Sequence, residues 1–172
     1  MTSRKTVTRQ AICAAAKRIV EDQGLGGLSM RTLASALQIK APSLYDHVKN
    51  RDEVVALVQA EGLADFGAGF AACGNSVEAK VLFYRRWALE NRHLYPVVFQ
   101  EFLHRDLLPE GLELKVLSQV VETVGGSHVE ARVVWAQLHG LVDLELHGRL
   151  PQDADIDATW SQVARSLSAG RS

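Results

Sequence analysis

The sequence predicts an all-α protein of about nine helices, with a three-helix head followed by a larger helical body. Helix-capping residues followed by apolar residues at three- to four-residue spacing recur along the 172 residues, and this spacing is typical of amphipathic helices. No stretch keeps the strict alternation of a half-buried strand. With 47% hydrophobic residues, the chain can bury a core of substantial size.

Three helical segments open the chain. The first is predicted to begin after Thr8, a good N-cap, and to stop at Gly24. Ser29 caps a second segment, and Pro42 opens a third, which we expect over residues 41–48. Two short helices joined by a tight turn are typical of a helix-turn-helix, so the sequence predicts one here.

The body begins with a longer helix. Asn50 and Glu53 form a capping-box-like start, and the helix is predicted to fade in the glycine-rich stretch 67–74. Later helices are predicted to start close to Ser76, Pro96, Pro109, Ser127 and Ile156. Ser127 with Glu130 forms a second capping box, directly after the glycines that end the preceding helix.

Charge is distributed unevenly between the two ends of the chain. Residues 1–51 hold nine Lys or Arg, Arg4 and Lys5 among them, against three Asp or Glu, whereas the rest holds ten against seventeen. The net charge of the whole chain is only −1. This asymmetry is expected if the N-terminal part binds phosphates and the remainder does not. Chance scatter of surface charge is the alternative.

Several classes of protein are disfavoured by what the sequence lacks. Cys13 and Cys73 have neither the number nor the spacing of a disulfide framework or a zinc site, so we expect ordinary thiols, with a redox sensor as the alternative. We find no nucleophile elbow, phosphate-binding glycine loop or catalytic carboxylate pair, so no enzyme and no cofactor are predicted. Without a run of about 18 apolar residues or a secretory signal, we expect a cytoplasmic protein with no membrane partner.

The third segment carries most of the side chains expected to contact DNA. Leu44 and Val48, at i and i+4, are predicted to pack inward. Outward side chains of a recognition helix contact base edges and phosphates, and here they are Pro42, Ser43, Tyr45, Asp46 and His47. The flanking bases suited to phosphates are Lys40, Lys49 and Arg51. An ordinary helical hairpin with core Leu and Tyr is the alternative.

The same residues resemble the DNA-binding segment of the tetracycline-repressor (TetR) family. The resemblance rests on two runs, Ser29-Met30-Arg31-Thr32-Leu33-Ala34 and Ile39-Lys40-Ala41-Pro42-Ser43-Leu44-Tyr45-Asp46-His47-Val48-Lys49-Asn50-Arg51, and covers about residues 8–58. It implies base contacts from Arg31, Ala41, Pro42 and Tyr45, and phosphate contacts from Ser43, Asp46, His47 and Arg51. Because Ala41 is too short to hydrogen-bond a base, the operator is expected to differ from the tetracycline one.

Two residues depart from the family pattern. Gln38 stands where the family usually has glycine in the turn, so the backbone there must avoid positive φ or carry strain. Asp46 places a negative charge where the family expects an aromatic, basic or polar group. Its carboxylate could accept from a cytosine amino group or pair with Lys49 or Lys5, whereas a phosphate would repel it.

The helix after Ser127 is apolar on two sides. One sector holds Ala131, Trp135, Leu138, Val142 and Leu146, and the other holds Val133, Val134, Gly140, Leu141 and Leu144. Such a helix needs two apolar neighbours, and we predict that one is the same helix of a second subunit, completed by the last helix in a four-helix intersubunit bundle. The homodimer interface is then predicted at Leu141, Leu144, Trp160, Val163 and Leu167. A helix buried within a monomer is the alternative.

The body also carries a pattern expected of a small-molecule site. The run from Trp135 to Gly140 resembles the Trp-x-x-x-His-Gly signature of one C-terminal subclass of the family, which implies a dimeric ligand-binding body. An apolar cavity is predicted from Phe83, Trp87, Phe99, Phe102, Trp135 and His139, with plain core packing as the alternative. His139 and Asp143 lie at i and i+4, but no third ligand is evident, so no metal is predicted.

The sequence therefore predicts a ligand-responsive, DNA-binding regulator of transcription. Residues 1–51 are expected to bind double-stranded operator DNA, and residues 52–172 to bind an unknown small molecule and to form the homodimer. We expect a repressor that an apolar or amphipathic molecule releases from a palindromic operator. A small helical ligand-binding protein or enzyme, or a protein-binding adaptor, with no DNA role is the alternative.

Overall fold

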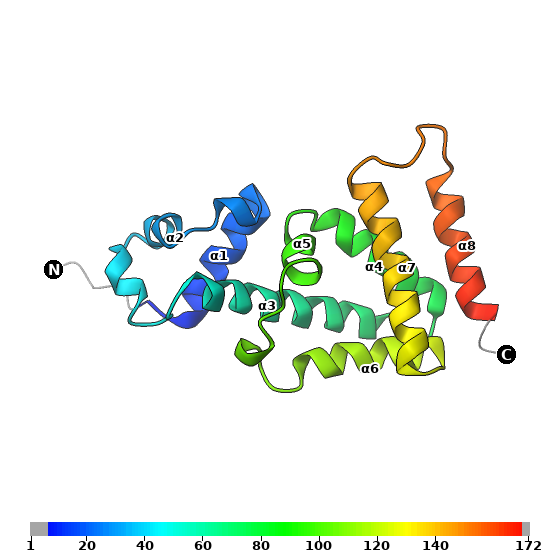
Figure 1. Cartoon of the computed structure of the whole chain (residues 1–172), viewed down its shortest axis with the longest axis horizontal. Helices are drawn as coiled ribbons and strands as arrows, with labels where there is room; N and C mark the ends of the chain where they lie inside the picture. The colour runs from blue at the N-terminus through cyan, green and yellow to red at the C-terminus, as the bar shows by residue number, and fades with distance from the viewer. Residues whose placement is uncertain (1–6, 170–172) are drawn as a thin grey trace. The chain divides into compact units, whose positions relative to one another are not determined.

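The structure is a computed structural model that describes residues 7–169 (Figure 1). The all-α prediction is confirmed, because this part of the chain forms eight α-helices and three 3₁₀ helices and no strand. The chain divides into two compact units, Met1–Leu63 with Asn91–Glu110, and Ala64–Glu90 with Gly111–Ser172. Two of the N-terminal bases, Arg4 and Lys5, lie outside the described residues.

The first unit contains the N-terminal helices and a later excursion of the chain. Its helices are α1 (Arg9–Gln23), η1 (Leu25–Gly27), α2 (Met30–Ala36), η2 (Ala41–Leu44), the beginning of α3 (Arg51–Ala72), α5 (Leu94–Phe99) and η3 (Arg105–Leu107). Segment 91–110 joins this unit partly through Gln59 of α3, a fully buried side chain whose amide donates to the carbonyl oxygens of Val97 and Phe102 at 3.0 Å each. The compact units therefore do not follow the division after Arg51, which stays a prediction about function.

The predicted caps of the first unit are present. The Thr8 hydroxyl accepts the N–H of Ala11 at 3.1 Å, and α1 ends at Gly24, where φ is 69°. Ser29 and Thr32 form a reciprocal capping box at the start of α2. These bonds satisfy N–H groups that the first turn of a helix leaves unpaired, which is why the helix starts could be read locally.

The expected helix over residues 41–48 is wrong in type. The chain forms only the 3₁₀ helix η2, in which the N–H of Tyr45 bonds to the carbonyl of Pro42 at 3.2 Å, and then turns. The N–H groups of His47 and Val48 both bond to the Leu44 carbonyl, at 2.9 and 3.0 Å. Such i to i+3 bonds are typical of runs too short to develop α-helical bonding. This segment is the ninth predicted helix, so the α-helix count falls to eight.

Helix α3 does not fade at its glycines as predicted but continues to Ala72. A Cβ at Gly62 would lie 2.4 Å from a methyl carbon of Val98, within the first unit. A Cβ at Gly69 would lie 2.3 Å from the ring of Phe83, within the second unit. These glycines mark close packing between elements rather than a helix end, and packing outweighs the low helix propensity of glycine.

The second unit is a group of helices around the C-terminal part of α3. Its other members are α4 (Val77–Glu90), α6 (Leu112–Val124), α7 (His128–Leu146) and α8 (Ile156–Ala169). The predicted capping box of Ser127 and Glu130 starts α7, and the predicted stop of α6 at Gly125 is present with φ of 65°. Helix α6 begins at Leu112 rather than near Pro109, because Gly111 at φ of 75° breaks the helix there.

One helix in residues 7–169 is long and apolar enough to cross a membrane by length and composition. It is α3, with a mean hydropathy of 1.3, and 56% of the tested window is buried inside the structure. A mostly buried core helix passes the same test.

Candidate functional site

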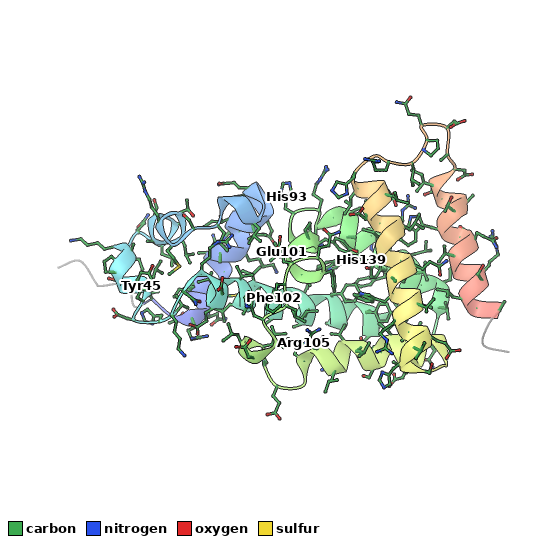
Figure 2. The ribbon with its side chains drawn as sticks, in the orientation of Figure 1. Tyr45, His93, Glu101, Phe102, Arg105 and His139 are labelled. Carbon is green, nitrogen blue, oxygen red and sulfur yellow. The ribbon has the colours of Figure 1, made fainter. Side chains whose placement is uncertain are left out.

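The segment 41–48 presents a polar surface on a buried footing. Leu44 and Val48 are buried as predicted, beside the buried Leu33 of α2. Pro42, Ser43 and Asp46 are exposed, and the Tyr45 ring, labelled in Figure 2, keeps 55% of its surface. Side chains held outward by a fixed backbone can contact base edges and phosphates with little loss of conformational freedom. The other predicted DNA contacts divide into exposed side chains, Arg31, Lys40 and Lys49, and half-buried ones, Ala41, His47 and Arg51.

Arg51 has a structural role in addition to the predicted phosphate contact. Its guanidinium donates to the carbonyl oxygens of Leu28 at 2.9 Å and Leu25 at 3.0 Å. Two of its five N–H groups are therefore used to hold η1 and the start of α2 against the first turn of α3. The sequence gave no sign of these backbone partners, since they lie 23 and 26 residues away.

The turn between α2 and η2 is strained. Gln38 adopts φ of 59° and is the one positive-φ residue other than glycine among residues 7–169. This outcome was one of the two expected for a residue standing where glycine is usual. The left-handed conformation places Cβ close to the following carbonyl, which costs about 1–2 kcal/mol for a residue with a side chain.

A charged clamp that the sequence analysis missed holds the end of this segment. The Arg9 guanidinium of α1 donates to the Glu53 carboxylate at 2.6 Å and to the His47 carbonyl at 3.0 Å. The second Glu53 oxygen accepts the backbone N–H of Lys49 at 2.6 Å, and this bond lowers the pKa of Glu53 most, with Arg9 acting in the same direction. The Asn50 side chain accepts the N–H of Glu53 at 2.9 Å, so the predicted cap exists with Glu53 reaching back one residue further.

The largest hollow of the first unit is not near its aromatic residues. A groove of about 420 Å³ lies between α1 and the C-terminal end of α2, down to Gln38. Its walls come mostly from alanines together with Arg18 and Asp22. The predicted small-molecule residues line none of it.

Four of the six predicted ligand residues lie in the second unit. Phe66, fully buried, has its ring centroid 5.4 to 6.2 Å from those of Phe70, Phe83, Tyr84, Trp87 and Trp135. The sequence analysis named Phe83, Trp87 and Trp135 but missed the central Phe66, whose seven-residue distance from Cys73 in a glycine-rich stretch hid it from a helical projection. The Trp87 indole N–H is satisfied by Asp65 at 3.0 Å, so this ring is positioned as core.

The other two predicted ligand residues belong to the first unit. Phe99 of α5 lies 5.3 Å from the Tyr95 ring. Phe102 is not helical, keeps 75% of its surface exposed, and its ring lies 5.2 Å from that of His104 (Figure 2). The predicted cavity therefore has no single set of six walls within either unit.

A small cavity does exist in the core of the second unit. Its volume is about 10 Å³, less than one water molecule needs, and Trp135 is its one wall among the predicted ligand residues. His139 lies beside it, with Nδ1 3.2 Å from the hydroxyl of the buried Tyr84. Burial lowers the pKa of His139, although Asp143 opposes the shift.

Helix α7 has one buried and one exposed apolar sector. Ala131, Leu138 and Val142 are buried, whereas Val133 and Leu144 are exposed and Leu141 is half-buried. Of the predicted interface residues on α8, Leu167 is half-buried, but Trp160 and Val163 are buried within their own chain. Trp160 has no exposed surface and its indole N–H donates to Glu145 at 2.7 Å, so it is a core residue and not a surface contact.

Cys13 is a buried thiol of the first unit. Its Sγ lies 3.0 Å from a Glu61 oxygen, and the same carboxylate pairs with Lys17 at 3.1 Å. Burial, followed by the contact with Glu61, raises the pKa of Cys13 to about 12. Because the thiolate is the reactive form, this environment disfavours reaction at Cys13.

Comparison with known proteins agrees with this arrangement. Residues 12–58 match the family described as bacterial regulatory proteins, tetR family, and residues 77–167 match the one described as tetracyclin repressor-like, C-terminal domain. A curated relative, an uncharacterised HTH-type transcriptional regulator of Mycobacterium tuberculosis, is 27% identical over 183 residues, covering 95% of this chain and 81% of the relative. The narrower Trp-x-x-x-His-Gly subclass stays a prediction.

Solved structures show the same fold. A protein of unknown function from Rhodococcus sp. RHA1 superposes with a TM-score of 0.79 at 18% identity, covering 99% of this chain and 98% of that one. The multidrug binding protein EbrR, complexed with imidazole, gives 0.63 at 22% identity, with 96% and 95% covered. With the helix-turn-helix and both matched segments in place, the chain belongs to the TetR family of bacterial transcriptional regulators.

Proposed function

We propose that the protein is a cytoplasmic homodimeric repressor that binds a palindromic operator and is released from it by a small molecule. The observation that carries the DNA role is the outward surface of segment 41–47, fixed by buried Leu44 and Val48 beneath it. In a helix-turn-helix this element enters the major groove. Its position after α2 and before α3 supports the same assignment here.

The side chains of this surface have separate tasks in the proposal. Tyr45 and Pro42 contact base edges, where an aromatic ring or a proline can pack on a thymine methyl group. Ser43, Lys40 and Lys49 contact phosphates and fix the register of the segment on the duplex. Asp46 is exposed without a described partner among the bonds above, and a cytosine amino group is the base-edge donor that suits a carboxylate.

The dimer follows from the exposed sector of α7. Val129, Val133 and Leu144 keep 61%, 63% and 41% of their surfaces, and Gly140 between them has open space around the position of a Cβ. Contiguous apolar surface on a soluble domain is typical of an interface, and a small residue at its centre permits close helix approach. Two heads on a twofold axis would then read half-sites ~34 Å apart or a multiple of that distance.

Ligand response is inferred from the second unit and from relatives. EbrR is described as a multidrug binding protein and was solved with imidazole. By analogy, the aromatic core around Phe66 is the proposed receptor for a small molecule. A coupling of about 1–3 kcal/mol between the two sites would change operator affinity ~5- to 150-fold, and operator would weaken the ligand by the same factor.

The DNA role is tested with the DNA upstream of the protein's own gene. Gel shifts and footprints with Tyr45→Ala should lose protection of a palindromic site, while Tyr45→Phe separates the ring from its hydroxyl. Leu114→Ala, at another exposed residue but in α6, is the matched control and should bind as the parent does. Equal affinity of the parent and Tyr45→Ala would exclude this segment as the reading element.

A further inference from the structure

A lysine side chain is buried where the helices of the second unit meet. Lys80 of α4 keeps only 7% of its surface, and it lines the 10 Å³ cavity together with residues from α3, α6, α7 and α8. The remaining walls are aliphatic or aromatic apart from Thr123, with Trp135, Leu138 and Leu167 among them. Lysine is one of the residues least often fully buried.

The ammonium is held by neutral groups. Its Nζ donates to the Thr123 hydroxyl oxygen at 2.7 Å, and that hydroxyl donates in turn to the Gln119 carbonyl at 2.6 Å. It also lies 5.0 Å from the centre of the Phe70 ring, within the range of a cation–π contact. These contacts fix the position of the positive charge at the wall of the cavity.

A positive charge at an apolar wall selects among ligands by their charge. In a low-dielectric interior the attraction to an anion is far stronger than in water, and the repulsion of a cation grows in the same way. A neutral ligand gains neither contribution. A binding site of this kind typically combines many apolar walls with very few polar groups that orient the ligand.

We propose that the second unit binds an apolar carboxylic acid, whose ring or chain lies among Trp135, Leu138 and Phe70 and whose carboxylate pairs with Lys80. The inference rests on the proposed function, since it names the chemical class of the releasing molecule. Thr123 completes the site by holding the ammonium toward the cavity. The ligand must displace side chains to enter, because about 10 Å³ is smaller than any such molecule.

Leu167 is the wall that has most room to move. It is half-buried, contributes the only α8 side chain to the cavity, and lies in the last turn of that helix. A ligand that lifts Leu167 would shift the end of α8, the helix assigned in part to the subunit interface. Binding in the cavity thereby reaches the dimer without a separate relay.

The test uses the full-length dimer and three probes with one ring system, 2-naphthoate, 2-naphthalenemethanol and 2-naphthylmethylammonium. Calorimetric titration should give a dissociation constant roughly tenfold or more lower for the acid than for the alcohol, with the ammonium compound weakest. Benzoate and octanoate with their alcohols and amines extend the comparison to smaller and to unbranched acids. Lys80→Met should remove the preference for the acids, and Lys80→Arg should keep it. Lys115→Met, at an exposed lysine of α6, is the matched control.

The outcomes separate this inference from the proposed function. If alcohols or amines bind as tightly as the acids, or if no acid of the three frameworks binds, the acid class is wrong while operator binding stands. If the acids bind through Lys80 but leave operator affinity unchanged, the acid site stands and the proposed ligand response fails. An unfolded Lys80→Met, seen by circular dichroism, leaves Lys80→Arg and the probe series to decide.

Discussion

Arg9 at the start of α1 and Glu53 at the start of α3 are joined by a 2.6 Å hydrogen-bonded ion pair. Between these two residues in sequence lies the whole helix-turn-helix. The pair also binds the backbone of the intervening segment, through the His47 carbonyl and the Lys49 N–H. The clamp therefore fixes the C-terminal end of the DNA-reading segment from two helices at once.

Glu53→Ala should weaken both folding and operator binding. The change removes the acceptor of the Lys49 N–H and the partner of Arg9, and we expect a loss of about 1–3 kcal/mol in the free energy of unfolding. Arg9→Ala should cost less, about 0–1 kcal/mol, because 53% of its side chain is exposed. Urea unfolding and gel shifts measure the two effects, and Asp52→Ala in the same turn is the control. A Glu53→Ala protein as stable as Asp52→Ala would exclude the clamp.

Stability should fall as His139 titrates. Burial lowers its pKa in the folded protein, so the unfolded chain binds the proton first as the pH decreases. The stability contributed by neutral His139 is present above the unfolded value of about 6.5 and is lost as pH falls toward the lower folded value. Thermal unfolding of the parent and of His139→Gln between pH 7.5 and 5 measures this. Parallel curves for the two proteins would contradict it.

Gln38→Gly should stabilise the protein. Glycine adopts φ of 59° without the clash of a Cβ, which outweighs its greater freedom in the unfolded chain by about 0.5–1 kcal/mol. Ser35→Gly, three residues earlier in α2, should destabilise by about 0.5 kcal/mol because its backbone is helical. Urea midpoints that move in the same direction for both variants would show that the turn is not strained.

Removing Glu145 should destabilise the second unit strongly. Its carboxylate accepts from Arg85 at 2.7 Å and from the Trp160 indole at 2.7 Å, joining α4, α7 and α8. Glu145→Ala leaves both donors without this partner, for an expected loss of about 2–4 kcal/mol. Asp157, the other partner of Arg85, is 86% exposed, so Asp157→Ala should change stability by less than about 0.5 kcal/mol. Comparable losses in the two variants would place the stabilisation elsewhere.

Leu144→Glu should break the proposed homodimer. Leu144 lies in the exposed apolar sector of α7, and a carboxylate there would be desolvated in each subunit of a twofold interface. Light scattering should report the monomer mass at concentrations where the parent is dimeric. Leu114→Glu carries the same change on exposed α6. A dimer that survives Leu144→Glu would remove this sector from the interface.

The helix starts could be predicted because their causes are local. Thr8, Ser29 and Ser127 each bond to an N–H three residues ahead, so the cap and its partner are visible together in the sequence. The type of η2 and the passage of α3 through Gly69 could not, because they depend on bonds and packing partners elsewhere in the fold. In the same way Trp160 reads as interface on a helical projection, yet Glu145 and Arg85 cover it.

The site divides along the same line. The inward Leu44 and Val48 follow from i, i+4 spacing, so the outward face of the reading segment was predictable. The Arg9 clamp and the Arg51 bonds to Leu25 and Leu28 join residues more than twenty positions apart, and periodicity carries no information about them. Lys80 looked like an ordinary solvated lysine until α6 and α7 were in place around it.

All three tryptophans of the chain, Trp87, Trp135 and Trp160, belong to the second unit. Intrinsic indole fluorescence is therefore a reporter of that unit alone, and emission excited at the red edge of absorbance is silent about the helix-turn-helix. Trp135 lines the cavity, so quenching or a spectral shift on adding an acid would report occupancy directly. Tyrosine emission from Tyr45 on an otherwise indole-free head offers a second, independent optical channel for contact with DNA.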